Sequence, residues 1–254
     1  MNAWASWPSG KPPPSHAEQT TPPAAPENAT RWSGSPQLGR VSAIAKGVRK
    51  TRSRFGGRLE PFFRLRLVLH VGRSDLMTVT SVETVEAHAR LRVDGPALDA
   101  AARACDAVAR LFDAAEPSAP VFHLLANELG LLDAHAGTPA THATHANQLA
   151  FRLKLLLAAG LAPQLAACAN CGEPDHLVAF SGAAGGVVCS ACEGGAFPLG
   201  QDAHAFMAGA LGSPLAGAPT ADPRALRQAE RAIAETVEHH AHTRLRAATP
   251  GRGA

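Results

Sequence analysis

The sequence Cys168-Ala-Asn-Cys171, followed seventeen residues later by Cys189-Ser-Ala-Cys192, places four cysteines in two close pairs. This spacing is typical of a zinc site with four thiolate ligands, because each CxxC turn directs two sulfur atoms toward one point. Four thiolates complete the tetrahedral coordination of Zn²⁺ and leave no position for water or substrate. We therefore expect these cysteines to hold a structural Zn²⁺ in a zinc knuckle at residues 165–197.

Length and composition set broad limits on the protein class. The chain has 254 residues, of which 46% are hydrophobic, and a formal net charge of +3. It is long enough for one or two domains with a substantial core, and its net charge is too small to indicate a partner. Cys105 lies alone in an alanine-rich helical stretch, so we expect it to be a small buried residue.

Cysteine usage and apolar patterning favour a reducing, cytoplasmic environment. Two CxxC pairs with one further thiol do not resemble the disulfide framework of a small secreted domain. The chain shows no signal-peptide pattern and no apolar run of eighteen residues. We therefore expect neither secretion nor a membrane partner.

The N-terminal segment differs in composition from the rest of the chain. Residues 1–40 hold eight of the twenty prolines and all three tryptophans, and they contain no Val, Ile or Phe. Such a stretch buries too little apolar surface to offset the entropy lost on ordering. We expect residues 1–37 to form a disordered, Pro-rich tail.

Two kinds of periodicity follow this tail and predict an α+β fold. Short strands are expected near Val41–Gly47, Phe62–Val71 and Leu76–Glu83, the last two as a hairpin. They indicate a small all-β domain at residues 38–90. Helical spacing of apolar residues predicts helices at 97–112, 120–132 and 147–161 and from Asp222, a plausible N-cap followed by Pro223, to about Leu245. These helices indicate a domain at residues 91–247 that contains the zinc knuckle.

A dense run of cations lies in the predicted β domain. Eight of them accompany a single acid, Glu60, between residues 46 and 66. They are Lys46, Arg49, Lys50, Arg52, Arg54, Arg58, Arg64 and Arg66. A flexible basic loop beside a β surface suits a nucleic-acid backbone, and Phe55 and Phe62 would offer stacking faces. The alternatives are a solvated charge run and a loop that binds an acidic protein partner.

The histidine-rich segments favour ordinary structural roles. His135, His142 and His145 lie in Ala/Thr/Gly-rich sequence, which we interpret as a solvated linker. The histidines at 239, 240 and 242 share the last helix with glutamates, which indicates a polar helix face.

No enzyme signature is evident in the sequence. A Walker loop, a nucleophile elbow and a paired-carboxylate pattern are all missing. A zinc deaminase would need H-x-E followed by P-C-x-x-C, but His16-Ala-Glu18 lies in the predicted tail and no proline precedes either cysteine pair. The closed metal site also disfavours a hydrolase, so we expect a non-enzymatic protein.

Several sequence segments resemble one family of proteins. Residues 35–50 (SPQLGRVSAIAKGVRK) and 53–62 (SRFGGRLEPF) resemble its early strand, basic turn and next segment. Phe180-Ser181, Gly185-Gly186 and the second cysteine pair are placed as in its zinc loop. From about residue 35 to 245 the chain is therefore similar to the RecO family of DNA repair and recombination mediators.

The resemblance implies a fold, a function and partners. It implies an N-terminal OB fold, which is a five-stranded β-barrel, and a helical domain with an inserted zinc knuckle. It implies binding of single- and double-stranded DNA, strand annealing, and joint action with RecR and single-strand-binding protein in loading RecA in the nucleoid. The implied DNA contacts are Lys46, Arg49, Lys50, Arg52, Arg54 and Arg58.

The sequence departs from the family at its start. The family begins with an apolar strand, a turn and a second apolar stretch, whereas this chain has proline-rich sequence there. We therefore expect the first strand of the barrel to be missing, with part of the second. A frameshift or a wrong start upstream of Ser35 is one hypothesis for this change. A zinc-containing scaffold for protein interactions is the alternative function.

Overall fold

The computed structural model describes residues 2–5, 29–35, 39–46, 55, 57–71, 77–112 and 117–248. The chain divides into two compact units. The first contains Met1–Ala89 with Asp113–Phe122, and the second contains Arg90–Phe112 with His123–Ala254. Across the residues that the structure describes, no helix combines the length and apolar character needed to cross a membrane.

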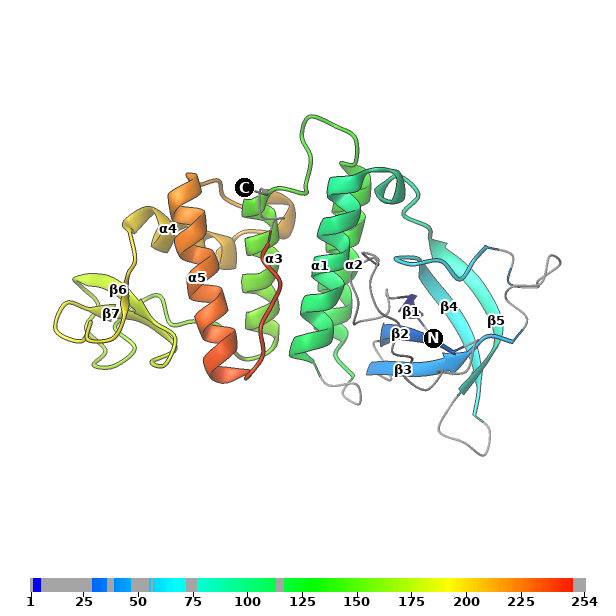
Figure 1. The fold of residues 1–254 in the computed structure, drawn as a ribbon, viewed down its shortest axis with the longest axis horizontal. Helices are drawn as coiled ribbons and strands as arrows, with labels where there is room; N and C mark the ends of the chain where they lie inside the picture. The colour runs from blue at the N-terminus through cyan, green and yellow to red at the C-terminus, as the bar shows by residue number, and fades with distance from the viewer. Residues whose placement is uncertain are drawn as a thin grey trace, which may run out of the picture. The chain divides into compact units, whose positions relative to one another are not determined.

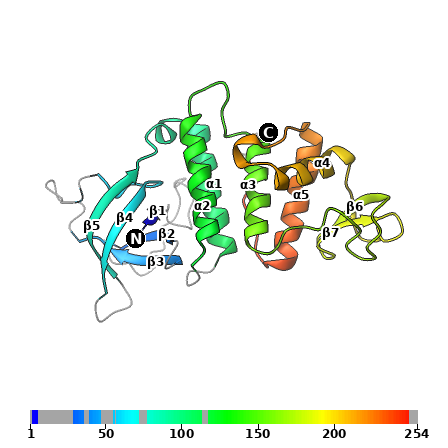
Figure 2. The ribbon, with the colours of Figure 1, turned by 180° about the vertical axis from the view of Figure 1, so that it is seen from behind.

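In its described ranges the first unit contains five strands, drawn in Figures 1 and 2. They are β1 (Asn2–Ala5), β2 (Ala29–Ser35), β3 (Gly39–Ile44), β4 (Arg64–His70) and β5 (Met77–Glu86). The pairing order is β1-β2-β3-β5-β4, and β1 also pairs with β4, so each strand has two neighbours. Among these five described strand pairings, β3–β5 alone is parallel.

The prediction that the first strand is missing is wrong. Strand β1 pairs with β2 through Trp4↔Ser33 and with β4 through Trp4↔Arg64. Proline explains the difference, because it cannot donate a backbone hydrogen bond to a ladder. All eight prolines of this segment lie outside the two strands, at residues 8–26 and at Pro36, so composition averaged over the segment hid two proline-free stretches.

Strands β4 and β5 form the predicted hairpin and fill the core of the first unit. In β4, Leu65 and Leu67 are buried while Arg66 and Val68 face outward, as the two-residue period of a strand requires. Leu67 lies opposite Val82 of β5. Ala43 of β3 packs in the same apolar cluster, so β3, β4 and β5 share one core.

Tryptophan fluorescence tests the N-terminal strands directly. The chain has no tyrosine and three tryptophans, at positions 4, 7 and 32, so this signal reports only on the N-terminal segment. Because Trp4 and Trp32 lie in paired strands, we expect a cooperative fluorescence transition on denaturation. Trp7 lies outside the described residues, and the Trp7→Phe variant should keep that transition. A gradual, non-cooperative change in both proteins would show that the strands do not form.

The second unit is mainly helical and contains a small sheet. Its helices are α1 (Gly95–Leu111), α2 (Ala119–Ala134), α3 (His145–Ala158), α4 (Gln201–Gly212) and α5 (Pro223–His240). The first residues of α2 are grouped with the first unit. Two short 3₁₀ turns are η1 (Leu91–Val93) and η2 (Leu215–Gly217). The sheet has the order β7-β6-β8, from β6 (Leu177–Ser181), β7 (Gly186–Cys189) and β8 (Phe197–Pro198).

Local sequence explains where α5 begins. Asp222 accepts hydrogen bonds from the amides of Arg224 and Ala225 at 2.7 and 2.9 Å, and Pro223 occupies the first helical turn. The predicted N-cap is thus confirmed. The helix ends at His240, short of the predicted Leu245. Helix α4 was not predicted from the sequence.

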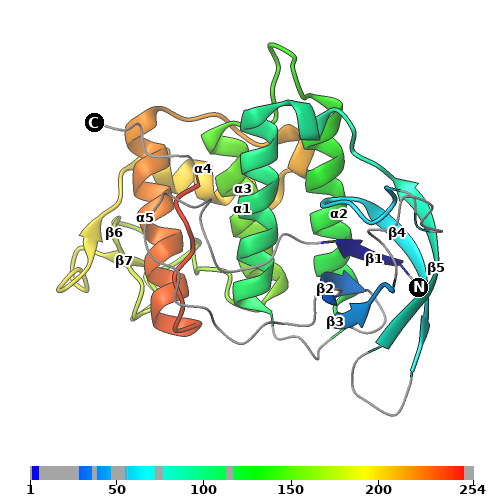
Figure 3. The same cartoon turned by 45° about the vertical axis from the view of Figure 1, so that its right-hand side comes forward.

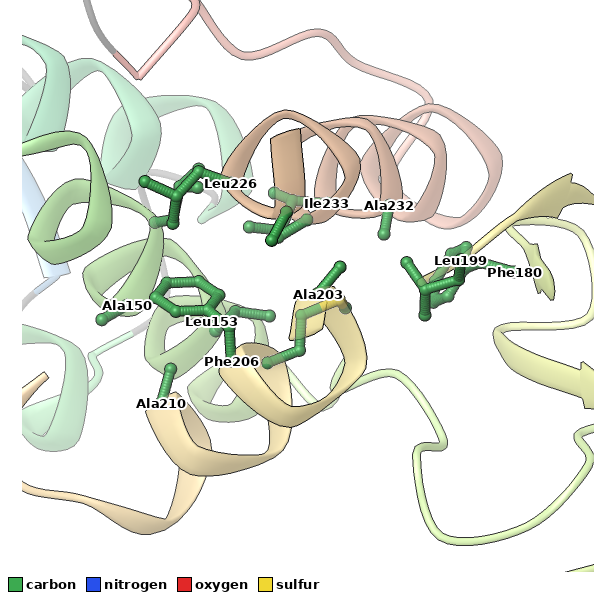
Figure 4. Packing of buried hydrophobic residues seen from close by; sticks show 14 of the residues in the cluster. Ala150, Leu153, Phe180, Leu199, Ala203, Phe206, Ala210, Leu226, Ala232 and Ile233 are labelled. Atoms are coloured by element: carbon green, nitrogen blue, oxygen red, sulfur yellow. The ribbon is translucent and has the colours of Figure 1, made fainter. Parts of the chain in front are cut away.

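The core of the second unit joins helices and sheet (Figure 4). Leu153 of α3, Phe206 of α4 and Ile233 of α5 are at most 2% exposed and belong to one cluster. Phe180 of β6 and Leu199, which follows β8, belong to the same cluster. The cysteine-containing segment therefore packs as part of the helical core.

Candidate metal centre and basic surface

The four predicted ligands lie together in the second unit. The sulfur atoms of Cys168, Cys171, Cys189 and Cys192 all lie within 4.8 Å of one another. Sulfurs at the corners of a regular tetrahedron, each about 2.3 Å from a zinc ion, would be about 3.8 Å apart. The Cys171 and Cys189 sulfurs are 3.7 Å apart, so the cluster has the size that a metal ion needs.

Two tight turns bring the sulfurs together. In the first, the Gly172 amide donates to the Cys168 carbonyl at 2.8 Å and Gly172 has a φ of +79°, which glycine adopts without strain. In the second, the Cys192 amide donates to the Cys189 carbonyl at 2.9 Å. Cys189 ends β7 and lies opposite Leu177 of β6, so the hairpin fixes the second turn.

The surroundings shift the pKa values of two of these thiols in opposite directions. Burial opposes ionisation of Cys168, but backbone amides of Cys189, Cys171 and Asn170 lower the pKa of its thiol to about 6. Hydrogen bonds from Cys171 and Cys189, together with burial, raise the pKa of Cys192 to about 12. Four crowded thiolates repel one another, and a bound dication would remove that repulsion. The donor set therefore fits a metal ion.

The β6–β7 hairpin is attached closely to α5 and to the segment before it. His240 Nε2 lies 2.8 Å from the Gly182 carbonyl oxygen. Gln164 pairs with the outer edge of β7, donating to the Gly185 carbonyl and accepting from the Val187 amide, both at 2.9 Å. The four-cysteine cluster is therefore connected to the helical core by backbone and side-chain contacts.

Gly182 marks the closest approach between hairpin and helix. A Cβ atom at this position would lie 2.7 Å from Glu235 Cβ and 2.9 Å from the Glu235 carbonyl carbon. We expect Gly182→Ala to lower the free energy of unfolding by about 1–3 kcal/mol, measured by denaturant titration. Gly130→Ala is the control, because a Cβ there meets nothing within 4 Å and alanine favours a helix. Equal stability of the two variants would contradict this packing.

The structure describes two of the six predicted DNA contacts. Lys46 follows β3 and Arg58 lies between β3 and β4, and both are exposed. Neither forms an ion pair with another residue of the described ranges. The remaining four predicted contacts lie outside those ranges: Arg49, Lys50, Arg52 and Arg54.

Two further cations of the basic run are neutralised on the β4–β5 hairpin. Arg64 pairs with Glu86 at 3.1 Å, and Arg66 pairs with Glu83 at 2.7 Å. The sequence alone did not identify these pairs, because the glutamates lie about twenty residues downstream of the run. Free positive charge among the described residues of the run is therefore confined to the β3–β4 connection.

The prediction that Phe55 and Phe62 stack on bases is wrong. Each is only 1% exposed, and Phe55 packs in the core of the first unit with Phe63 and Leu65. These aromatic side chains contribute to folding, because a small β core needs large apolar side chains to fill it.

The histidines of segment 134–146 also differ from their predicted role. His142 is buried and its Nε2 lies 3.1 Å from Glu128 Oε2, while Gln148 donates to the other oxygen of Glu128 at 2.7 Å. His145 pairs with Glu230 of α5 at 3.0 Å. The solvated-linker interpretation is wrong for both residues: His142 pairs with a buried carboxylate, and His145 pairs with a half-buried one.

Two family models match successive parts of the chain. The family model described as "Recombination protein O N terminal" matches residues 35–88. The model described as "Recombination protein O C terminal" matches residues 92–248, more than half of the chain. The chain belongs to the RecO family. The predicted resemblance is therefore confirmed.

Curated RecO relatives extend over most of this chain. The DNA repair protein RecO of Anaeromyxobacter dehalogenans strain 2CP-C is 38% identical over 220 residues, covering 83% of this chain and 84% of the relative. That of Frankia casuarinae is 38% identical over 214 residues, covering 83% and 86%. That of Thermobifida fusca is 39% identical over 158 residues, covering 61% and 63%.

RecO membership places the chain among DNA repair and recombination proteins, as the sequence predicted. The RecO family is not a known enzyme family, in agreement with the prediction of a non-enzymatic protein. The four cysteines fall within the C-terminal family match, and the basic run falls within the N-terminal match.

Proposed function

We propose that this RecO chain is a DNA-binding recombination mediator in DNA repair. It would bind single- and double-stranded DNA, anneal complementary strands and, with RecR and single-strand-binding protein, help to load RecA at the nucleoid in the cytoplasm. The single observation that carries the proposal is RecO family membership over most of the chain. Lys46 and Arg58, which are exposed and form no ion pair with another described residue, support it.

The β unit would present the DNA-binding surface. Its strand order, with a parallel β3–β5 pair and a β1–β4 pair, supports an OB-type barrel. We assign this fold to residues 38–90, completed by the two N-terminal strands. The proposed contacts lie on the β3–β4 connection and are Lys46, Arg49, Lys50, Arg52, Arg54 and Arg58.

The binding would be electrostatic and independent of base sequence. Cations that neutralise phosphates release condensed counterions, which supplies affinity for any strand. Neutralisation also lowers the repulsion between two complementary strands, which would favour annealing. The buried aromatics support this view, because Phe55 and Phe62 are unable to read or stack on bases.

The four cysteines would hold a structural Zn²⁺ in the helical domain, which we assign to residues 91–247. The size of the sulfur cluster supports this assignment. A bound zinc ion would neutralise the thiolates and fix the two turns that carry them. The function of the metal would therefore be stability of the helical domain.

Strand annealing tests the proposed function. The full-length protein is expected to accelerate annealing of two complementary oligonucleotides at low salt, and the acceleration should disappear at high salt. Fluorescence quenching between end-labelled strands measures the rate. Absence of both annealing and DNA binding at low salt would refute the proposal and favour a protein-interaction scaffold, whose basic loop would then bind an acidic protein partner.

A further inference from the structure

The chain after α5 returns along the helical unit (Figures 1 and 3). His242 has a φ of +50°, in the left-handed region, where the chain reverses. Residues 244–248, here called the C-terminal clasp, have no regular secondary structure. Nevertheless Ala248 is only 2% exposed, and Leu245 packs against the core of the unit.

Three helices bind the backbone of three consecutive clasp residues. Arg152 of α3 donates from Nη2 to the Arg246 carbonyl oxygen, and Arg103 of α1 donates from Nη1 to the Ala247 carbonyl oxygen, each at 2.5 Å. The Ala248 amide donates to Oε1 of Glu230 on α5, also at 2.5 Å. Each bond has one charged partner, and such bonds are stronger than neutral ones.

The charged groups that hold the clasp are themselves held in place. Asp99 accepts from Arg103 Nε at 2.8 Å. His145 Nε2 lies 3.0 Å from the second oxygen of Glu230, and Arg152 Nη1 lies 3.8 Å from the first. These contacts join side chains of α1, α3 and α5 to one backbone segment.

The clasp side chains add weaker ion pairs at its edges. Arg244 pairs with Glu238 at 3.0 Å, and Arg246 approaches Asp106 at 3.7 Å. The side chains of both arginines are at least half exposed, so these pairs contribute little stability. The backbone bonds and the buried methyl group of Ala248 therefore dominate the attachment.

We infer that the C-terminal clasp is an openable element that fastens α1, α3 and α5 together. Its bonds run from side chains to an irregular backbone, so it can detach while the helices keep their own hydrogen bonds. The helical unit then has two states. In the closed state the guanidinium groups of Arg103 and Arg152 bind the chain's own carbonyls, and in the open state those bonds are broken.

Hydrogen exchange on the full-length chain tests this inference. In the wild type, the Ala248 amide, which donates to Glu230, is expected to exchange more slowly than a free amide but faster than the amides of buried α3 and α5 turns. Glu230→Gln keeps the shape but removes the charge, and it should accelerate clasp exchange about tenfold. Arg103→Ala should do the same. Arg231→Ala is the control, because Arg231 makes a similar ion pair, with Glu235, away from the clasp.

Two results would overturn the inference. Unchanged clasp exchange in both variants would show that these groups do not hold the segment. Equal acceleration throughout α3 and α5 would show that the segment opens only with global unfolding. A chain ending at residue 243 gives a second measurement: it should keep its helical circular dichroism at room temperature and melt several degrees lower, whereas loss of the helices would contradict a separable clasp.

Discussion

Changing Arg49, Lys50, Arg52 and Arg54 together to alanine is expected to weaken binding to single-stranded DNA strongly while leaving the helical unit intact. If each cation neutralises one phosphate, the slope of log affinity against log salt should become less steep by about 2.8, since each contact contributes about 0.7 for single strands. Fluorescence anisotropy with a labelled oligonucleotide measures this slope. Circular dichroism and metal content should stay at wild-type values.

A matched control comes from the same basic run. Arg66 is already paired with Glu83 at 2.7 Å, so Arg66→Ala combined with Glu83→Ala removes a cation without changing net charge. This double variant should keep the wild-type slope. If both variants lowered affinity equally, DNA binding would depend on the fold of the β unit rather than on the proposed contacts.

Replacing Cys168 by serine is expected to abolish tight zinc binding and to destabilise the helical unit. The β6–β7 hairpin beside the four cysteines buries Phe180 and Val187 in the helical core, so loss of the hairpin exposes core surface. Metal binding to such a site contributes directly to folding stability. We expect the helical melting temperature to fall by about 10 °C or more, measured by circular dichroism with metal analysis of the same sample.

Cys105→Ser is the matched control for this prediction. Cys105 is buried in α1, and burial raises the pKa of its thiol to about 12, as expected for an inert thiol. This variant should keep full zinc content. A Cys168→Ser protein that retained zinc and melted as the wild type does would contradict the structural role of the metal. At temperatures where the Cys168→Ser protein remains folded, we expect its affinity for DNA to equal that of the wild type.

Some features were predictable from sequence because they depend on local signals. The spacing of the four cysteines predicted that their sulfur atoms lie close together, and Asp222 with Pro223 predicted the start of α5. The alternation around Leu65 and Leu67 predicted β4. In each case the residues that decide the feature lie close together in the chain.

Other features were not predictable because they depend on distant partners. His142 appeared to lie in a linker, but its partner Glu128 comes from the preceding helix. Phe55 appeared available for stacking because its burial depends on residues such as Leu67 and Val79. Strand β1 was missed partly because it pairs with β4, about sixty residues away, and both N-terminal strands were missed because composition averaged over the segment hid two proline-free stretches.

The most direct measurement of the central claim is the affinity of the full-length, zinc-loaded protein for a single-stranded oligonucleotide over a range of salt concentrations. With six phosphate contacts on the β3–β4 connection, log affinity should fall linearly with log salt, with a slope of about −4. No binding at low salt, or an affinity that does not depend on salt, would contradict the account.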